Sequence, residues 1–213
     1  MLTELSGLIS FLLLALPLPC AAIAPSATDQ PFVLTRMDLD LEGDYDSNTI
    51  GGTATLEVRN ASAKPRARIP LLLNRLMTLS KIVDAAGAAL PFTQSVVVFN
   101  DDPARQVDSI SVTLPRAIRP GASFTMVLHY RGILVGYTET GSRYIQDHVD
   151  HDFTIIREDA YAFPTLGVPS DVANRAAPRE PFMFSARVTV PASLVVAMPG
   201  APRERSQRNS LTA

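Results

Sequence analysis

The chain has 213 residues, of which 46% are hydrophobic and 19% charged, and its formal net charge at pH 7 is -2. This composition is too apolar for a disordered chain and too balanced in charge for a protein that binds nucleic acid through its net charge. A single cysteine excludes an internal disulfide framework. The 17 prolines disfavour long helices, and the three histidines leave few choices for a metal site.

Residues 1–24 have the pattern of an export signal. Gly7 to Leu18 form a nearly continuous apolar run, too short to span a bilayer comfortably, and Ala22-Ile23-Ala24 offers a cleavage site of the A-x-A type. Because Glu4 is present and Lys and Arg are absent before the run, an uncleaved anchor is the alternative. We therefore expect an exported protein, periplasmic or extracellular, that is membrane-anchored only if this segment is retained.

Residues 25–200 are predicted to form one all-β domain. Short alternating segments recur about every 10 to 15 residues and are bounded by Pro, Gly, Asn or Asp. Met37 to Leu41 is the clearest example, with the acids Asp38 and Asp40 on one face. Such spacing favours an antiparallel β-sandwich or a curved sheet. The predicted strands are Phe32–Leu41, Gly51–Asn60, Ile69–Leu73, Leu79–Val83, Pro91–Phe99, Val107–Leu114, Ser123–Tyr130, Phe182–Val190 and Leu194–Met198.

Two further segments differ in character from these strands. Gly132 to Pro181 is rich in Gly and Pro and concentrates aromatic and charged residues, so we expect a long loop region that carries function or forms a contact surface. Residues 201–213 are polar with little to bury, and we expect a disordered tail.

Four segments, in their order and spacing, carry a resemblance to a known family. They are Met37–Leu41, Val112–Leu114 with Pro120-Gly121 and Leu128–Gly132, Asp159–Pro164, and Phe184–Pro191. Together they resemble the N-terminal domain of the M1 family of zinc metallopeptidases, the gluzincin aminopeptidases. The segment Asp159-Ala160-Tyr161-Ala162-Phe163-Pro164 is similar to the family's "DAR..FP..DEP" turn and is the best match. The resemblance implies a β-sandwich or curved sheet like that N-terminal domain.

The resemblance also implies where the chemistry lies. The family binds zinc through HExxH and a distant Glu on a helical domain that follows, and the Glu of the motif activates water. His129, His148 and His151 are each followed by a residue other than Glu, so the motif is absent from this sequence. We expect no catalytic residue, metal ligand or cofactor in this chain, with zinc only in a missing catalytic domain.

The same resemblance assigns a substrate cleft to the turn. The candidates for lining it are Arg157, Glu158, Asp159, Tyr161, Phe163 and Pro164. In the family, a Gln or Glu just before the turn accepts hydrogen bonds from the substrate ammonium. Here Arg157 or Ile155 occupies that position, neither can accept from an ammonium, and Glu158 is the nearest acid. The expected partners are an M1-type catalytic domain or a peptide substrate, and no nucleic acid.

Two hypotheses follow for the function. The preferred one is a non-catalytic β domain, from a truncated or split gene, that walls the substrate cleft and docks on the catalytic domain. Loss of that domain is expected to leave an apolar patch around Tyr137, Tyr144, Tyr161 and Phe163. The alternative is a self-standing exported β-sandwich for binding or envelope structure.

Four polar clusters suggest sites but have simpler explanations. The cluster of His148, Asp150, His151 and Asp152 has suitable ligands for zinc, although a solvated loop is the more common outcome. Asp101-Asp102 before Pro103 has the chemistry of a turn. Asp44, Asp46 and Asn48 match the opening of an EF-hand loop, but Gly is missing at the required place. Arg157, Glu158 and Asp159 are predicted to form an ion-pair cluster that ties the loop to the sheet.

Overall fold

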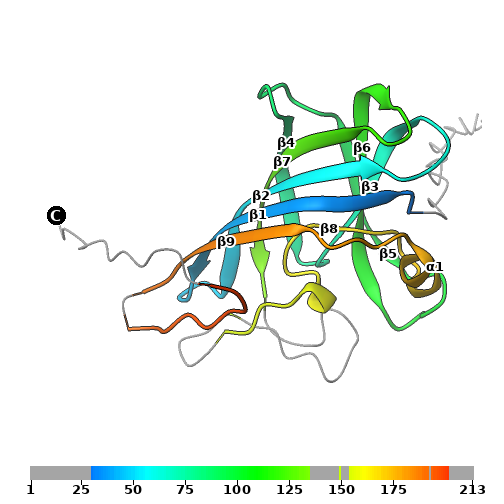
Figure 1. Ribbon diagram of the computed structural model, residues 1–213. Coiled ribbons are helices and arrows are strands. Elements are labelled where there is room, and N and C mark those ends of the chain that lie inside the picture. Colours follow the sequence, from blue (N-terminus) through cyan, green and yellow to red (C-terminus); the bar gives the residue numbers. More distant parts are fainter. Residues whose placement is uncertain (1–29, 135–148, 150–153, 192, 202–213) are drawn as a thin grey trace, which may run out of the picture.

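The described structure consists of two packed β-sheets. This computed structural model describes residues 30–134, 149, 154–191 and 193–201 (Figure 1). The predicted export segment, the tail beyond Ala201 and the cluster His148, Asp150, His151 and Asp152 lie outside the described residues. The strands are β1 (Phe32–Asp44), β2 (Thr49–Asn60), β3 (Arg66–Leu73), β4 (Met77–Asp84), β5 (Phe92–Val98), β6 (Gln106–Ile118), β7 (Ser123–Ile133), β8 (Thr165–Leu166) and β9 (Met183–Thr189).

Alternation along the strands builds the core. One sheet has the order β4-β7-β2-β1-β9 and the other β5-β6-β3-β8. In β1, Met37, Leu39 and Leu41 are buried, whereas Asp38 and Asp40 lie on the outer face opposite Thr55 and Thr53 of β2. The same period in the other strands brings apolar residues of both sheets into one cluster, among them Leu56, Val58, Ile69, Leu71, Ile110, Val112, Met126 and Leu128. The all-β fold and the acidic face of β1 are therefore confirmed.

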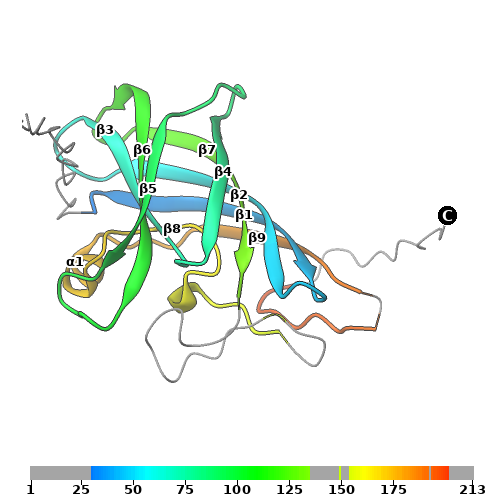
Figure 2. The same ribbon diagram turned by 180° about the vertical axis from the view of Figure 1, so that it is seen from behind.

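The sheets are not wholly antiparallel. β9 pairs in parallel with β1, with Arg36 to Glu42 of β1 opposite Met183 to Thr189. A parallel neighbour requires a long crossover. Residues between β7 and β9 supply it: they contribute β8 to the second sheet, and the chain then turns through a short helix before it returns to the first (Figures 1 and 2). Short-range periodicity carries no information on strand direction, so the expected antiparallel order was wrong for this pair.

The predicted loop and last strand also differ from the structure. The helix α1 (Asp171–Ala176), a 3-10 turn (Glu158–Ala160) and β8 lie within the predicted loop. Six residues are too few for a helical stripe to be recognised. The predicted strand Leu194–Met198 does not form, and Val195 is 83% exposed, because no neighbouring strand among the described residues pairs with it.

The two sheets are joined at one corner by a glutamine. Gln94 of β5 accepts a hydrogen bond from the Leu79 N–H at 2.9 Å, and its Nε2 donates to the Met77 carbonyl at 2.8 Å and to Asp108 Oδ2 at 2.7 Å. Asp108 is 3% exposed, and burial raises the pKa of its carboxyl group while the bond from Gln94 opposes the rise. This contact joins the edges β4 and β5.

Among the described residues, no helix is long and apolar enough to cross a membrane.

Gly52 allows β2 to pass close to β1. Its φ is +144°, and a Cβ there would lie 1.8 Å from the Asp40 carbonyl oxygen. We expect Gly52→Ala to lower the free energy of unfolding by about 3 kcal/mol or more, since backbone would have to move. Gly87→Ala is the control: its φ is +84° but nothing lies within 4 Å, so only the ~1 kcal/mol conformational cost applies. Equal losses in urea titrations would contradict this account.

Candidate functional site

The turn from Glu158 to Pro164 is fixed to the second sheet by Asn74. The 3-10 turn ends at Tyr161, which has a left-handed φ of 54°. The Asn74 N–H donates to the Tyr161 carbonyl at 2.8 Å, and Asn74 Nδ2 donates to the Ala160 carbonyl at 3.0 Å. Asn74 Oδ1 also accepts from the Leu76 N–H at 3.0 Å. Asn74 is buried, so these hydrogen bonds are shielded from water.

The side chain of Tyr161 forms part of the core. Its ring lies 6.2 Å from the ring of Phe99, beside Leu72 and Val107. The guanidinium of Arg105 lies 5.1 Å from the centre of the Phe99 ring and pairs with Asp171 of α1 at 2.7 Å. Burial raises the pKa of Tyr161 to about 12. Tyr161 therefore holds the turn in place and is not a freely exposed cleft residue.

The remaining predicted cleft residues divide into two groups. Phe163 is half-buried against the core, and Pro164 is buried. Glu158 and Asp159 are exposed, and Arg157 Nε lies 3.6 Å from Asp159 Oδ1 within the turn. The tie between turn and sheet is thus made by Asn74 and Tyr161. The structure presents two carboxylates, those of Glu158 and Asp159, on a firmly held turn. Tyr137 and Tyr144, expected beside them in an apolar patch, lie outside the described residues.

Asp101 caps the helix α1. Its carboxylate accepts from the backbone N–H groups of Val172 at 2.7 Å and Asp171 at 2.9 Å, and from the Ser170 hydroxyl at 2.9 Å. These bonds, chiefly that from Val172, lower the pKa of Asp101 to about 2. Asp102 accepts from the Ala104 N–H at 3.1 Å. Turn chemistry therefore explains Asp102, as predicted from the sequence, whereas the contact of Asp101 with the start of α1 was not predicted.

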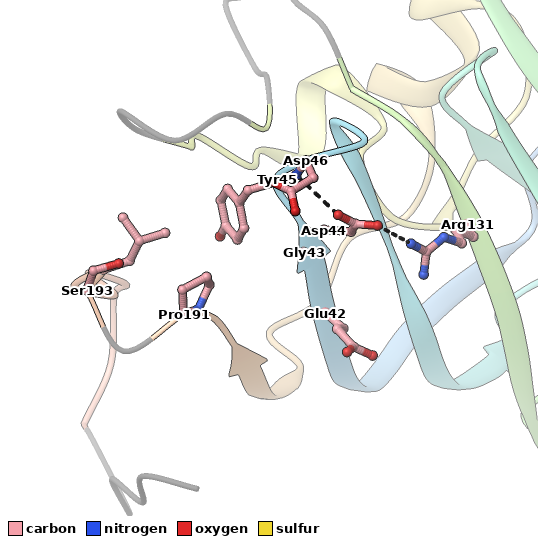
Figure 3. Close-up of a pocket in the computed structure, with 9 residues that line it drawn as sticks. Glu42, Gly43, Asp44, Tyr45, Asp46, Arg131, Pro191 and Ser193 are labelled. Carbon is pink, nitrogen blue, oxygen red and sulfur yellow. Dashed lines mark hydrogen bonds and ion pairs between the residues drawn. The ribbon is translucent and has the colours of Figure 1, made fainter. Parts of the chain in front are cut away.

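A pocket lies at the end of the β1–β2 hairpin. It has a volume of about 470 Å³, and its lining combines charged, aromatic and aliphatic side chains (Figure 3). Asp44 Oδ1 accepts from the N–H groups of Asp46 at 3.2 Å and Ser47 at 3.3 Å, and Oδ2 lies 3.4 Å from Arg131 Nη2. Hydrogen bonds from Ser47 hold the pKa of Asp44 below its usual value. The lining residues are Glu42, Gly43, Asp44, Tyr45, Asp46, Arg131, Pro191, Ser193 and Leu194.

The pocket suits contact with a polar group more than enclosure of an apolar cofactor. The Asp44–Asn48 segment is a hairpin turn, with Asn48 at a φ of 52°. Within the described ranges, no group of three or more His, Cys, Asp or Glu side chains is arranged to hold a metal ion. This pocket could not be predicted from the sequence, because Pro191, Ser193 and Leu194 contribute to its lining from far along the chain.

Three comparisons with known proteins gave matches among solved structures alone. No protein-family model and no curated protein matches the chain. Among solved structures, it is similar to the M1 zinc metallopeptidase of Deinococcus radiodurans, with 24% identity and a TM-score of 0.39 over 50% of this chain and 21% of that one. It is also similar to a two-domain M1 zinc metallopeptidase bound to L-tryptophan, with 25% identity and a TM-score of 0.39 over 51% of this chain and 22% of that one. Yeast LTA4 hydrolase in complex with bestatin is similar with 14% identity and a TM-score of 0.38, over 55% of this chain and 19% of that one.

These structures belong to the proteins that the sequence motifs resemble. In each case the similarity covers about half of this chain and about a fifth of the other protein. The chain thus spans about a fifth of the length of those proteins, and their activities are statements about the longer proteins.

Replacing Asn74 tests the anchoring of the turn. Asn74→Ala leaves the Ala160 carbonyl and the Leu76 N–H without their partner, and we expect the free energy of unfolding to fall by about 2–4 kcal/mol. Asn100→Ala, at an exposed position, is expected to change it by less than about 0.5 kcal/mol. Chemical denaturation of both variants measures the difference, and a small effect of Asn74→Ala would show that the turn is held otherwise.

The cap at Asp101 predicts a pH dependence. The folded pKa of about 2 lies below the usual value of 3.8, so the carboxylate stabilises the fold above pH 4 and this contribution is lost as the pH falls towards 2. Asp101→Asn should therefore lower the melting temperature at pH 7, and its difference from the parent should shrink between about pH 4 and 2. Asp102→Asn is the control, with a smaller effect expected. A pH-independent difference would be evidence against the cap.

Proposed function

We propose that this chain is a non-catalytic β domain that works beside a zinc-bearing M1-type catalytic domain and walls one side of its substrate cleft. The observation that carries the proposal is the turn Glu158–Pro164. It contains the best family-like motif, Asp159–Pro164, and it is bonded to the sheet through Asn74. The side chains of Glu158 and Asp159 are exposed on it. A rigid turn with outward carboxylates is suited to a fixed contact with a neighbouring domain or a peptide.

The carboxylates define the chemistry of that contact. Ionised Glu158 and Asp159 can only accept hydrogen bonds. They would therefore face Arg or Lys side chains of the catalytic domain, or the ammonium of a peptide substrate. Catalysis itself would belong to the partner domain, which supplies the zinc ligands and the base. As an exported chain, it would do this work in the periplasm or outside the cell.

The hairpin-end pocket favours a second candidate. A pocket of about 470 Å³ with the charges of Glu42, Asp46 and Arg131 is the kind of surface with which a self-standing binding module would hold a polar ligand. In that case the turn would be a structural element, and the pocket would be the site.

An activity assay gives the first test. The purified chain, supplied with zinc, is expected to release no amino acid from aminoacyl anilides, because its sequence has no HExxH motif. Chelator-sensitive turnover by this polypeptide alone would refute the proposal. A catalytically inert chain is expected under both candidates, so a binding measurement must separate them.

Charge reversal at the two surfaces separates the candidates. We expect calorimetry to show that this chain binds an M1-type catalytic domain from the same organism, when that catalytic domain is produced without any attached β domain. The double variant Glu158→Lys/Asp159→Lys should weaken that binding at least about tenfold, because each acid meets a cation. Asp46→Lys, in the hairpin-end pocket, should leave it unchanged. Failure to bind any such domain, or dependence on Asp46 alone, would favour the self-standing module.

A further inference from the structure

The outer edge of β9 is open in the part of the chain that the structure describes. β9 has seven residues and pairs with β1 along one side, and no described strand pairs with its other side (Figure 1). The opposite corner is different, since Gln94 bonds β5 to β4 there. An edge of this length presents a row of backbone donors and acceptors to another strand.

The side chains of this edge are apolar where natural edges are usually protected. Phe182, Met183 and Phe184 are 44%, 65% and 45% exposed. Phe184 lies opposite Met37 and so on the core-side face of the sheet, yet it is only half covered. β9 contains no Pro or Lys, the residues that commonly block strand addition. Its one charge, Arg187, is paired with Asp40 at 3.3 Å.

We propose that β9 pairs antiparallel with β9 of a second copy of this chain, about a twofold axis at Ala186. The pairing would join the two five-stranded sheets into one continuous sheet. The interface would be isologous, with the same surface used by both copies. This inference uses residues other than the turn and pocket of the proposed function.

The side-chain pattern selects this register. With Ala186 opposite Ala186, all seven residues of β9 are paired, and Phe184 lies opposite Val188 of the second copy, twice by symmetry. Aromatic and β-branched pairs are favourable across antiparallel strands. A shift of the axis to Arg187 would place two like charges opposite each other, which is unfavourable. A shift to Ser185 would place Phe184 opposite Ala186, and Val188 and Thr189 would lie opposite Phe182 and Pro181, which precede the strand. Pro181 has no N–H to donate to the added strand.

Charge complementarity supports the same register on the outer face. Arg187 would lie opposite Ser185 of the second copy. Ser185 donates a hydrogen bond to Asp38 Oδ1 at 2.5 Å, and Asp38 Oδ2 pairs with Arg36 at 2.6 Å. Each Arg187 would therefore have Asp40 of its own copy on one side and, beyond Ser185, the Asp38–Arg36 pair of the other copy. The Arg187 side chain is 79% exposed and long enough to reach towards the added strand. The axis at Ala186 thus pairs a cation with carboxylates across the interface.

Sedimentation equilibrium of the full chain tests the association. We expect the average molecular mass to rise with protein concentration towards twice the mass of one chain. Phe184→Lys and Phe184→Asp should each raise the dissociation constant of the dimer roughly thirtyfold, because two symmetric aromatic pairs are lost and charges face an apolar strand. Using both signs of charge removes net charge as the cause. Val96→Lys, at an exposed position of β5, is the matched control and should dimerise like the parent.

Cysteine cross-linking tests the register. Because Cys20 is the chain's one cysteine, Cys20→Ser provides a clean background. Opposed Cα atoms in an antiparallel pair are about 4.5–5.5 Å apart, within the range of a disulfide. Ala186→Cys in this background should form covalent dimers on mild oxidation. Val96→Cys should not.

The outcomes that would overturn the inference are distinct from those for the proposed function. They are a chain that is monomeric at every accessible concentration, a dimer that both Phe184 variants retain with native circular dichroism, or cross-linking at Val96 equal to that at Ala186. Binding to a catalytic domain and its dependence on Glu158 and Asp159 can succeed or fail independently of each of these results.

Discussion

Burial of one face of each sheet against the other is the interaction on which the rest of this structure depends. Leu56, Leu71, Ile110 and Leu128 come from four strands in two sheets, and all are at most 1% exposed. The core they form is continuous, so the loops that project from it start from fixed points. The turn at Glu158–Pro164 is held because Asn74 follows the buried strand β3 directly, and the hairpin-end pocket is placed by β1 and β2.

The strands could be predicted from the sequence because their information is local. Alternation in Met37–Leu41 fixes which side chains face the core, and that face is the one observed. The direction of β9 could not be predicted, since it depends on a crossover through another sheet. Leu194–Met198 alternates like a strand but has no described partner, which shows that alternation is necessary and not sufficient for a strand.

The acidic residues of the candidate site can be recognised in the sequence, whereas the contacts that anchor them cannot. The acidic turn was located from its motif, and the acids at 101 and 102 from turn chemistry. Asn74, which holds that turn, and Gln94, which joins the two sheets, make their contacts through side-chain amides with residues distant in sequence. A polar residue just after a buried run, as Asn74 is, gives the one sequence signal that could have drawn attention to such a link.

The edges at the two corners of the sandwich differ in whether a side chain bridges them, and the bridged corner carries an electrostatic cost. At the closed corner, Asp108 is buried with one hydrogen bond from Gln94, and burial raises the pKa of its carboxyl group. Its contribution to stability is therefore greatest at low pH and is lost as the pH rises through the folded pKa. A buried carboxylate that costs stability at neutral pH persists at the corner where it helps to orient the Gln94 bridge. No comparable bridge covers β9 among the described residues, so that edge keeps its capacity to pair with another strand.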